Sequence, residues 1–357
     1  MKHHSINFLC CLLTLLCGTQ AWGQTQLRVT NGSLRITGDV NVVLTNTDLT
    51  NNASVTATAG TVIFRGATAD NTIGGTNGSQ LHNLTIDKPT NNVNLGADLS
   101  VAGAVNLLNG LLELTDFDLA LGDAATLQSS SAINYVSTSG TGAVTRLVEN
   151  GGFFNFIVGL GSPTHILLEN SGTGDTYRVR VANKVLTQGT TGTPYSTNVV
   201  DQTWYVSEEV PGGSDLSLTV EWFAGEELPG LDRNNCYVAQ YDGGWMLDAG
   251  GPATGDGPFQ ASRSGITSVS QFAVASGVVL PVELLQFTGE TVAKTNVLRW
   301  ASANEEGFSH YEVERSTDGA TSWHFLGAIA GAMQGQGAME YGYVDNNPPA
   351  SAYYRLR

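Results

Sequence analysis

The chain has 357 residues, which is enough for two or three domains of ordinary size. Charged residues make up only 13% of it, 43 residues are glycine, and the formal net charge is −16. So few helix-forming charged residues argue against a helical protein and favour strands joined by tight turns. The acidic balance repels phosphate backbones, which argues against nucleic acid as a partner.

The N-terminus has the pattern of a secretory signal peptide. Lys2 precedes an apolar run over residues 8–17, and Ala21-Trp22-Gly23 follows as a small-x-small cleavage pattern. We therefore expect residues 1–23 to be a signal peptide and the mature protein to be extracellular or on the outer cell surface. The apolar run is too short for a permanent transmembrane helix, and no other stretch is long enough. A lipid anchor at Cys17 is the alternative, although Leu16 stands where a small residue is required.

Cleavage before Gln24 would remove three of the four cysteines and leave Cys236 alone. No intramolecular disulfide can then form, so stability must come from packing and hydrogen bonding. Cys236 lies in an expected strand, and we predict a buried thiol.

Residues 24–130 predict a short-strand, β-solenoid-like domain. Couplets of the form apolar-polar-apolar recur, with Gly, Asn or Asp between them at the turns. Short strands at this spacing suit coils that bury their inward faces against one another. An irregular sandwich of the same strands is the alternative. The couplets centre on residues 28, 35, 41, 63, 85, 94, 100, 106, 113 and 120.

Residues 131–277 predict an antiparallel β-sandwich, because alternating strands are separated by turn signals such as Pro211-Gly212-Gly213. The expected strands are 151–159, 176–181, 203–206, 216–222, 237–241 and 271–274.

Residues 278–357 predict a third, truncated sandwich. Its six expected strands centre on 284–287, 297–300, 311–315, 323–326, 341–344 and 353–356. This segment resembles the fibronectin type III-like module of secreted and surface proteins of the Bacteroidetes. The resemblance implies Trp300 as the core tryptophan and Tyr353 or Tyr354 as the corner tyrosine. It also implies a missing seventh strand, a missing C-terminal sorting domain, and the type IX secretion machinery as an export partner.

Catalytic signatures are absent from the sequence: it has no G-x-S-x-G elbow, no H-E-x-x-H helix and no phosphate loop. We therefore predict no enzyme and no catalytic residue. A β-helix polysaccharide lyase or hydrolase is the enzymatic alternative, since such enzymes use carboxylates and a basic residue on an exposed sheet. Its candidates are Asp87, Asp98, Asp116, Asp118, Asp123 and Lys88. The aspartates are expected instead to make local hydrogen bonds in turns.

Two aromatic residues are the candidate ligand contacts. Trp245 follows the turn Asp242-Gly243-Gly244, where its ring would be exposed for sugar stacking, and Tyr241 lies just before that turn. Trp204 and Trp222 alternate with apolar neighbours and are expected in the core. We expect no cofactor. Bound calcium is the alternative, suggested by residues 116–118 and 345–347, although the sequence has no complete calcium-binding loop.

We therefore predict an exported, non-enzymatic surface or extracellular protein that acts in adhesion or matrix contact. The alternative binding role is a glycan-binding module of a secreted polysaccharide-degrading system. The expected partners are an extracellular polysaccharide or a surface protein.

Overall fold

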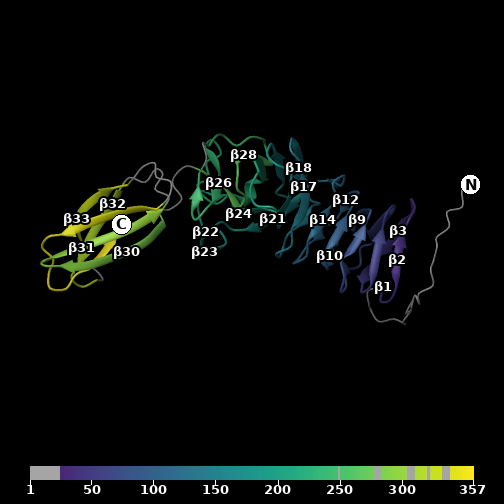
Figure 1. Cartoon of the computed structure of the whole chain (residues 1–357), viewed down its shortest axis with the longest axis horizontal. Coiled ribbons are helices and arrows are strands. Elements are labelled where there is room, and N and C mark those ends of the chain that lie inside the picture. The colour runs from purple at the N-terminus through teal and green to yellow at the C-terminus, as the bar shows by residue number, and fades with distance from the viewer. Residues whose placement is uncertain (1–24, 248–249, 277–282, 304–309, 320–321, 332–337) are drawn as a thin grey trace, which may run out of the picture.

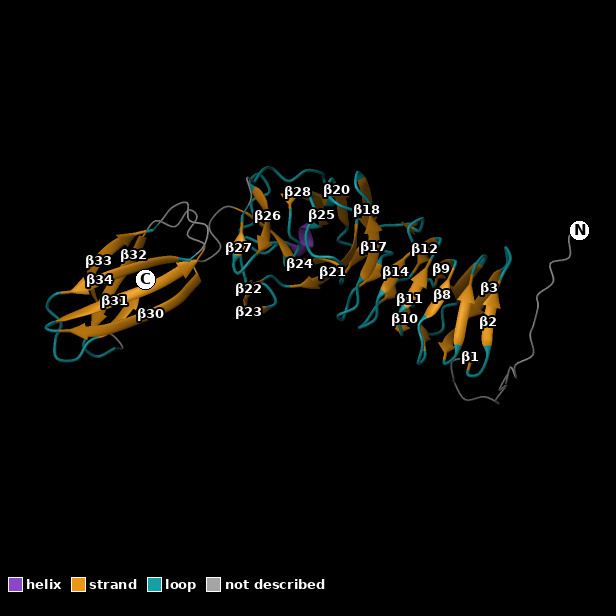
Figure 2. Ribbon diagram, in the orientation of Figure 1, coloured by secondary structure: helices purple, strands orange, loops and turns teal. Residues whose placement is uncertain are grey.

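The computed structural model describes residues 25–247, 250–276, 283–303, 310–319, 322–331 and 338–357. These residues form β-strands and one short 3-10 helix, η1 (Ala224–Glu226) (Figures 1 and 2). The predicted all-β class is confirmed. The predicted signal peptide lies outside the described residues. Within the described part, no helix has the length and apolarity needed to cross a bilayer.

The N-terminal part is a three-sided solenoid, as predicted. Successive strands pass from one side to the next, and each side is a parallel sheet in which a strand pairs with its equivalent one coil later (Figure 1). The strands are β1 (Thr25–Val29), β2 (Ser33–Ile36), β3 (Asn41–Thr45), β4 (Thr47–Asn51), β5 (Ser54–Ala57), β6 (Thr61–Arg65), β7 (Asn71–Gly74), β8 (Ser79–Leu81), β9 (Asn83–Asp87), β10 (Val93–Gly96), β11 (Leu99–Val101), β12 (Ala104–Asn109), β13 (Leu112–Glu113), β14 (Leu119–Leu121), β15 (Thr126–Ser129) and β16 (Val136–Ser137).

The couplets form these strands because their two apolar side chains both point inward. Leu84 and Ile86 in β9 are 0% exposed, and Val105 and Leu107 in β12 lie in register beside them and are also 0% exposed. Each coil therefore buries its inward side chains against those of the next coil, which is the source of the solenoid's hydrophobic core.

The turn aspartates and asparagines bond across coils, which corrects the expectation of local turn bonding. Asp98 Oδ1 accepts the backbone N–H of Asp118 at 3.0 Å, and Asp118 Oδ1 accepts that of Ala143 at 2.9 Å. On another corner, Asp70 accepts from Asn92 at 2.7 Å, and Asn92 accepts from Leu111 at 3.0 Å. These partners are 19–25 residues apart, about one coil, so the side chains satisfy corner N–H groups that lie between sheets.

The middle part is a sandwich built directly onto the end of the solenoid. One solenoid side continues through β17 (Val144–Val148) into antiparallel strands, giving an eleven-stranded sheet with the order β2-β5-β8-β11-β14-β17-β21-β24-β29-β26-β27. The added strands are β21 (Asp175–Asn183), β24 (Gln202–Glu208), β26 (Cys236–Tyr241), β27 (Trp245–Met246) and β29 (Gln271–Ser276).

A four-stranded sheet forms the second layer. It contains β18 (Gly152–Phe156), β20 (Ile166–Asn170), β25 (Leu216–Trp222) and β28 (Phe259–Ile266). The predicted single strand 151–159 is wrong, because β18 joins this sheet whereas β19 (Val158–Gly159) completes a solenoid side. A small separate hairpin pairs β22 (Leu186–Gln188) with β23 (Thr191–Pro194).

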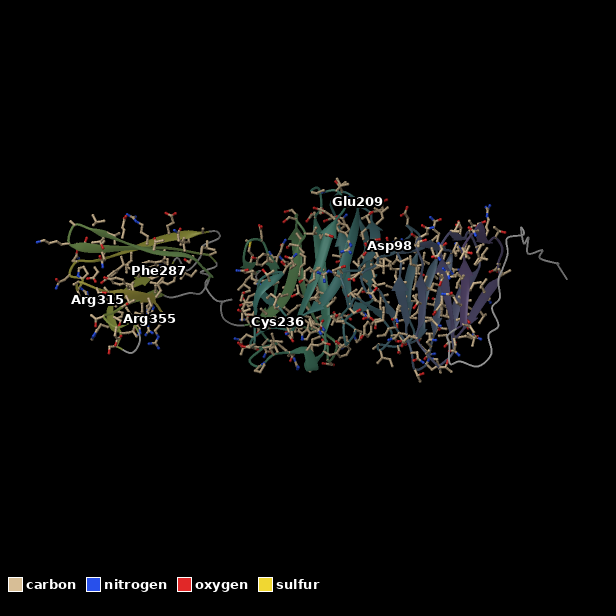
Figure 3. All side chains as sticks on the ribbon, turned by 90° about the horizontal axis from the view of Figure 1, so that it is seen from below. Asp98, Glu209, Cys236, Phe287, Arg315 and Arg355 are labelled. Atoms are coloured by element: carbon tan, nitrogen blue, oxygen red, sulfur yellow. The ribbon has the colours of Figure 1, made fainter. Side chains whose placement is uncertain are left out.

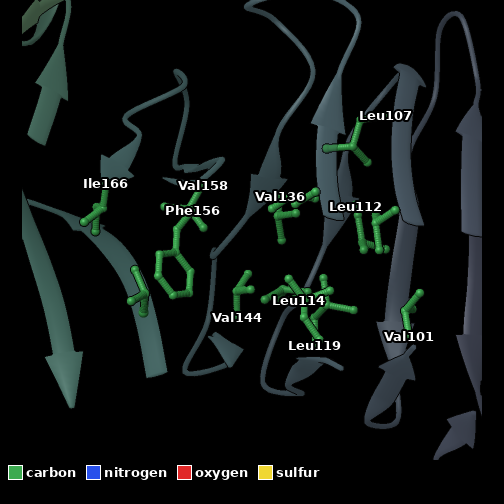
Figure 4. Close-up of a cluster of buried hydrophobic side chains, with 14 of the residues drawn as sticks. Val101, Leu107, Leu112, Leu114, Leu119, Val136, Val144, Phe156, Val158 and Ile166 are labelled. Atoms are coloured by element: carbon green, nitrogen blue, oxygen red, sulfur yellow. The ribbon is translucent and has the colours of Figure 1, made fainter. Parts of the chain in front are cut away.

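The solenoid and the sandwich share one hydrophobic core. Buried side chains continue from Val101 and Leu119 in the solenoid, through Val144, to Phe156 and Ile166 in the sandwich (Figure 4). Trp204 and Trp222 are 0% exposed in the same core, as predicted. The predicted domain boundary at 130/131 stays a prediction, since the sheet and the core both cross it.

The C-terminal part has its own core. Two three-stranded sheets, β30-β31-β34 and β33-β32-β35, face each other across Leu298, Trp300, Tyr311 and Val313. All six predicted strands are present: β30 (Glu283–Val292), β31 (Thr295–Ala303), β32 (His310–Ser316), β33 (His324–Ala330), β34 (Met339–Asp345) and β35 (Tyr353–Leu356).

Candidate functional site

Among the sheets of the described residues, the eleven-stranded one has the most strands, and its outer face is the candidate contact surface. On the first eight strands of the sheet, from β2 to β24, residues between the buried ones point outward, and the register places one such residue per strand in a continuous line. We call this line the outer row. It consists of Arg35, Thr56, Gln80, Ser100, Ala120, Thr145, Arg178 and Ser207.

The outer row runs from the solenoid into the sandwich without a break. Arg35, Gln80, Ser100 and Ser207 are exposed, and the others are half-buried. Seven spacings of about 4.8 Å between strands make the row about 34 Å long. It carries two arginines and no carboxylate, in a chain whose net charge is −16.

Asp118 holds Arg178, which is the first residue of the outer row that lies in the sandwich. The Arg178 guanidinium donates two hydrogen bonds to the Asp118 carboxylate, at 2.7 and 3.1 Å, and a third to the Thr141 carbonyl at 2.7 Å. A bidentate pair of this kind holds both side chains in a defined geometry. Asp118 therefore ties a solenoid corner to sandwich strand β21.

An arginine and a tyrosine stack beside the row. The Arg180 guanidinium lies 3.8 Å from the centroid of the Tyr205 ring. Burial lowers the pKa of Arg180, while the nearby Tyr205 acts in the opposite direction. This cation–π contact covers one face of the Tyr205 ring and restricts the side chains of Arg180 and Tyr205 next to the outer row.

The structure corrects the predicted exposure of Trp245. Its side chain is buried, with only 3% exposed, and its indole N–H donates to the Leu186 carbonyl at 2.8 Å. Strand β27 pairs back onto β26, which places Trp245 under the segment that contains Val185 and Val199. The open ring face that sugar stacking requires is therefore covered.

Tyr241, the second predicted contact, is half-buried beside Trp245, with ring centroids 5.5 Å apart. Gly189 lies against it with φ +69°, and an added Cβ there would be 2.7 Å from a carbon of the Tyr241 ring. The two predicted aromatics are thus together, but in a packed cluster.

The candidate residues of the enzymatic alternative do not share one face. Asp98 and Asp118 sit at one corner, whereas Asp87 bonds Asn109 at 2.8 Å at the end of β9. The Asp123 side chain is exposed, and the Lys88 side chain is 0% exposed and cannot meet a substrate in this conformation. Figure 3 shows Asp98 on the solenoid, far from Phe287, Arg315 and Arg355 of the C-terminal part.

The acidic residues suggested for calcium have protein partners. Asp116 Oδ1 accepts the backbone N–H and the hydroxyl of Thr141, at 3.0 and 3.1 Å, and these bonds lower the pKa of Asp116. Asp345 accepts hydrogen bonds from Arg315, Tyr354 and Asn347. In the part of the chain that the structure describes, no group of three or more His, Cys, Asp or Glu side chains has a metal-binding arrangement.

The sequence did not reveal the outer row, because its residues are seven ordinary polar residues and one alanine, spaced 20–33 positions apart. The recurring polar middle residue of each couplet is the one signal that could have found it. Comparison of the chain with family models, with curated protein sequences and with solved structures returned no match.

Proposed function

We propose that this is an exported, non-enzymatic surface or extracellular protein that contacts its partner through the outer row. Its role is adhesion or matrix contact. The partner is a surface protein or an extracellular polysaccharide.

The observation that supports this proposal most strongly is the continuity of the outer row across eight paired strands. A rigid face about 34 Å long, at about 4.8 Å per strand, matches the scale of a standard protein interface. The strands are held by main-chain hydrogen bonds and a shared core, so binding would order few side chains and lose little entropy.

Export is proposed from the pattern of residues 1–23 and from the resemblance of the C-terminal part to a fibronectin type III-like module. Two features of that part support the resemblance. Trp300 is 2% exposed and stacks on Tyr341 at 5.7 Å, which suits a core tryptophan. The Tyr354 hydroxyl donates to Asp345 at 2.8 Å and accepts from Asn296, which ties the last strand to the opposite sheet.

A binding panel tests the proposal. Purified residues 24–357 would be applied to immobilised matrix proteins and to neutral and acidic polysaccharides, at two salt concentrations. Saturable retention on a protein supports adhesion. Saturable retention on one polysaccharide supports the glycan-binding alternative.

Enzymatic action is tested in the same panel. Release of reducing ends or unsaturated products from a polysaccharide would contradict the non-enzymatic proposal. Absence of retention on every surface would contradict the binding role itself.

A further inference from the structure

Lys88 and Asn71 form a buried polar pair inside the solenoid. Both side chains are 0% exposed, and the Lys88 Nζ lies 2.5 Å from the Asn71 Oδ1. Lysine is almost never fully buried unless it is paired. A pair at this depth therefore requires a physical explanation.

Asn71 stands at the end of a row that is apolar in the four coils that follow it. The inward-facing residue at the same position is Val93 in the next coil, then Leu112, Val136 and Val158 in the following ones. Each of these four residues is 0% exposed. An apolar side chain at the first position of β7 could be buried without a hydrogen-bond partner, whereas a buried amide needs one. Packing alone therefore does not account for Asn71.

A carboxylate lies next to the amide. Asn71 Nδ2 donates to Asp48 Oδ1 at 3.5 Å, and the same oxygen accepts the backbone N–H of Thr72 at 2.8 Å. Burial lowers the pKa of Lys88, whereas Asp70 and Asp48 act in the opposite direction. A lowered pKa increases the share of neutral amine, which is the nucleophilic form of lysine.

We propose that Lys88 and Asn71 form an intramolecular isopeptide bond, with Asp48 as the proton-transfer group. The neutral Nζ attacks Cγ of Asn71, and the new Nζ–Cγ bond replaces the Cγ–Nδ2 bond. Asp48 takes the proton lost by the attacking nitrogen and returns it to the departing Nδ2, which leaves as ammonia. No oxidant, reductant or other co-reactant is required, and the Asp48 carboxylate is regenerated.

The bond would close one coil of the solenoid into a covalent ring. Asn71 begins β7 and Lys88 follows β9, so the two residues, 17 positions apart, mark the start and the end of the coil. Residues 24–357 contain a single cysteine and no disulfide. A covalent ring would restrict the unfolded chain as a disulfide does. This modification is independent of binding at the outer row.

Mass spectrometry of folded residues 24–357 tests the proposal. A protease that cleaves before aspartate separates residues 70–86 from residues 87–97. The bond predicts one species that carries both fragments and is lighter than their sum by one ammonia. Loss of ammonia at Asn77-Gly78 would lighten residues 70–86 without joining the two fragments. The joined species is therefore specific for the isopeptide bond.

Substitutions show which side chains form the bond and which one transfers the proton. Lys88→Met and Asn71→Leu should each yield two separate fragments, whereas the exposed-lysine control Lys294→Met should yield the joined species. Asp48→Asn should reduce the joined fraction at least several-fold. Two separate, unmodified fragments from folded wild-type protein would overturn the proposal. An unchanged joined fraction in Asp48→Asn would overturn the role of Asp48.

Discussion

Cys236 is the single cysteine of residues 24–357, and the fold removes its thiol from solvent. The side chain is 3% exposed, and Sγ donates to the Asp232 carbonyl at 3.3 Å. Burial is the largest cause that raises the pKa of the thiol from 9.0 to about 11, with Asp232 and Glu227 acting in the same direction. The thiolate is the reactive form, so this cysteine is structural.

At the residue scale, the thiol should be unreactive in the folded protein. Iodoacetamide at pH 8 should leave Cys236 unmodified in native residues 24–357 and alkylate it fully in urea, as intact mass would measure. Rapid, complete alkylation of the native protein would contradict the buried thiol.

The same pKa predicts a loss of stability at alkaline pH. The folded-state pKa is raised, so the unfolded chain releases its proton first as pH rises. The contribution is present below about pH 9 and is lost as pH rises towards about 11. Chemical unfolding of wild type and Cys236→Ala across pH 8–11 should show a steeper decline for wild type. Parallel curves would contradict this assignment.

At the element scale, side chains that bond across coils hold the solenoid corners together. Asp118 bonds in two directions, because it accepts from the backbone N–H of Ala143 and also from the guanidinium of Arg178 in the sandwich. Its carboxylate is 34% exposed, so water screens part of the interaction.

Asp118→Ala should lower the free energy of unfolding by about 1–3 kcal/mol, since it leaves the Ala143 N–H without its acceptor and the Arg178 guanidinium without its carboxylate partner. Urea unfolding followed by tryptophan fluorescence measures this change. Asp123→Ala is the matched control, because the Asp123 side chain is exposed; it should change stability by less than about 0.5 kcal/mol. Equal effects of the two substitutions would contradict the role of the cross-coil bonds.

The elements were predicted well from the sequence, because strand identity depends on local alternation. Leu84-Thr85-Ile86 shows this alternation, and it lies in strand β9. The features that were predicted wrongly depend on contacts with residues that are distant in the sequence. Trp245 is buried by the segment around Val185, and Asp98 bonds a residue 20 positions away. Lys88 follows an ordinary couplet, and nothing local indicates that its Nζ turns inward to Asn71.

At the scale of the whole molecule, the described chain has one long body and a smaller one. The main core continues from Val29 to Val274, whereas Leu298, Trp300, Tyr311 and Val313 form a separate core. Because the solenoid and the sandwich share a core and a sheet, we expect them to unfold as a single cooperative unit.

Calorimetry of residues 24–357 should therefore show two transitions. Leu84→Ala should destabilise the larger one by about 2–5 kcal/mol and leave the smaller unchanged, because Leu84 is 0% exposed in the main core. Leu298→Ala should have the reverse effect. A third transition that responds to sandwich substitutions alone would show that solenoid and sandwich unfold separately.

Contact through the outer row is the central claim, and one pair of substitutions tests it most directly. Ser100→Arg places a bulky side chain in the middle of the row, whereas Gln128→Arg makes an equivalent change on an exposed position of the five-stranded sheet. Binding is measured on the matrix protein or polysaccharide that retains wild-type residues 24–357. We predict that Ser100→Arg weakens binding at least ~10-fold, about 1.4 kcal/mol, and that Gln128→Arg leaves it unchanged. Equal binding by the two variants would contradict the outer row as the contact surface.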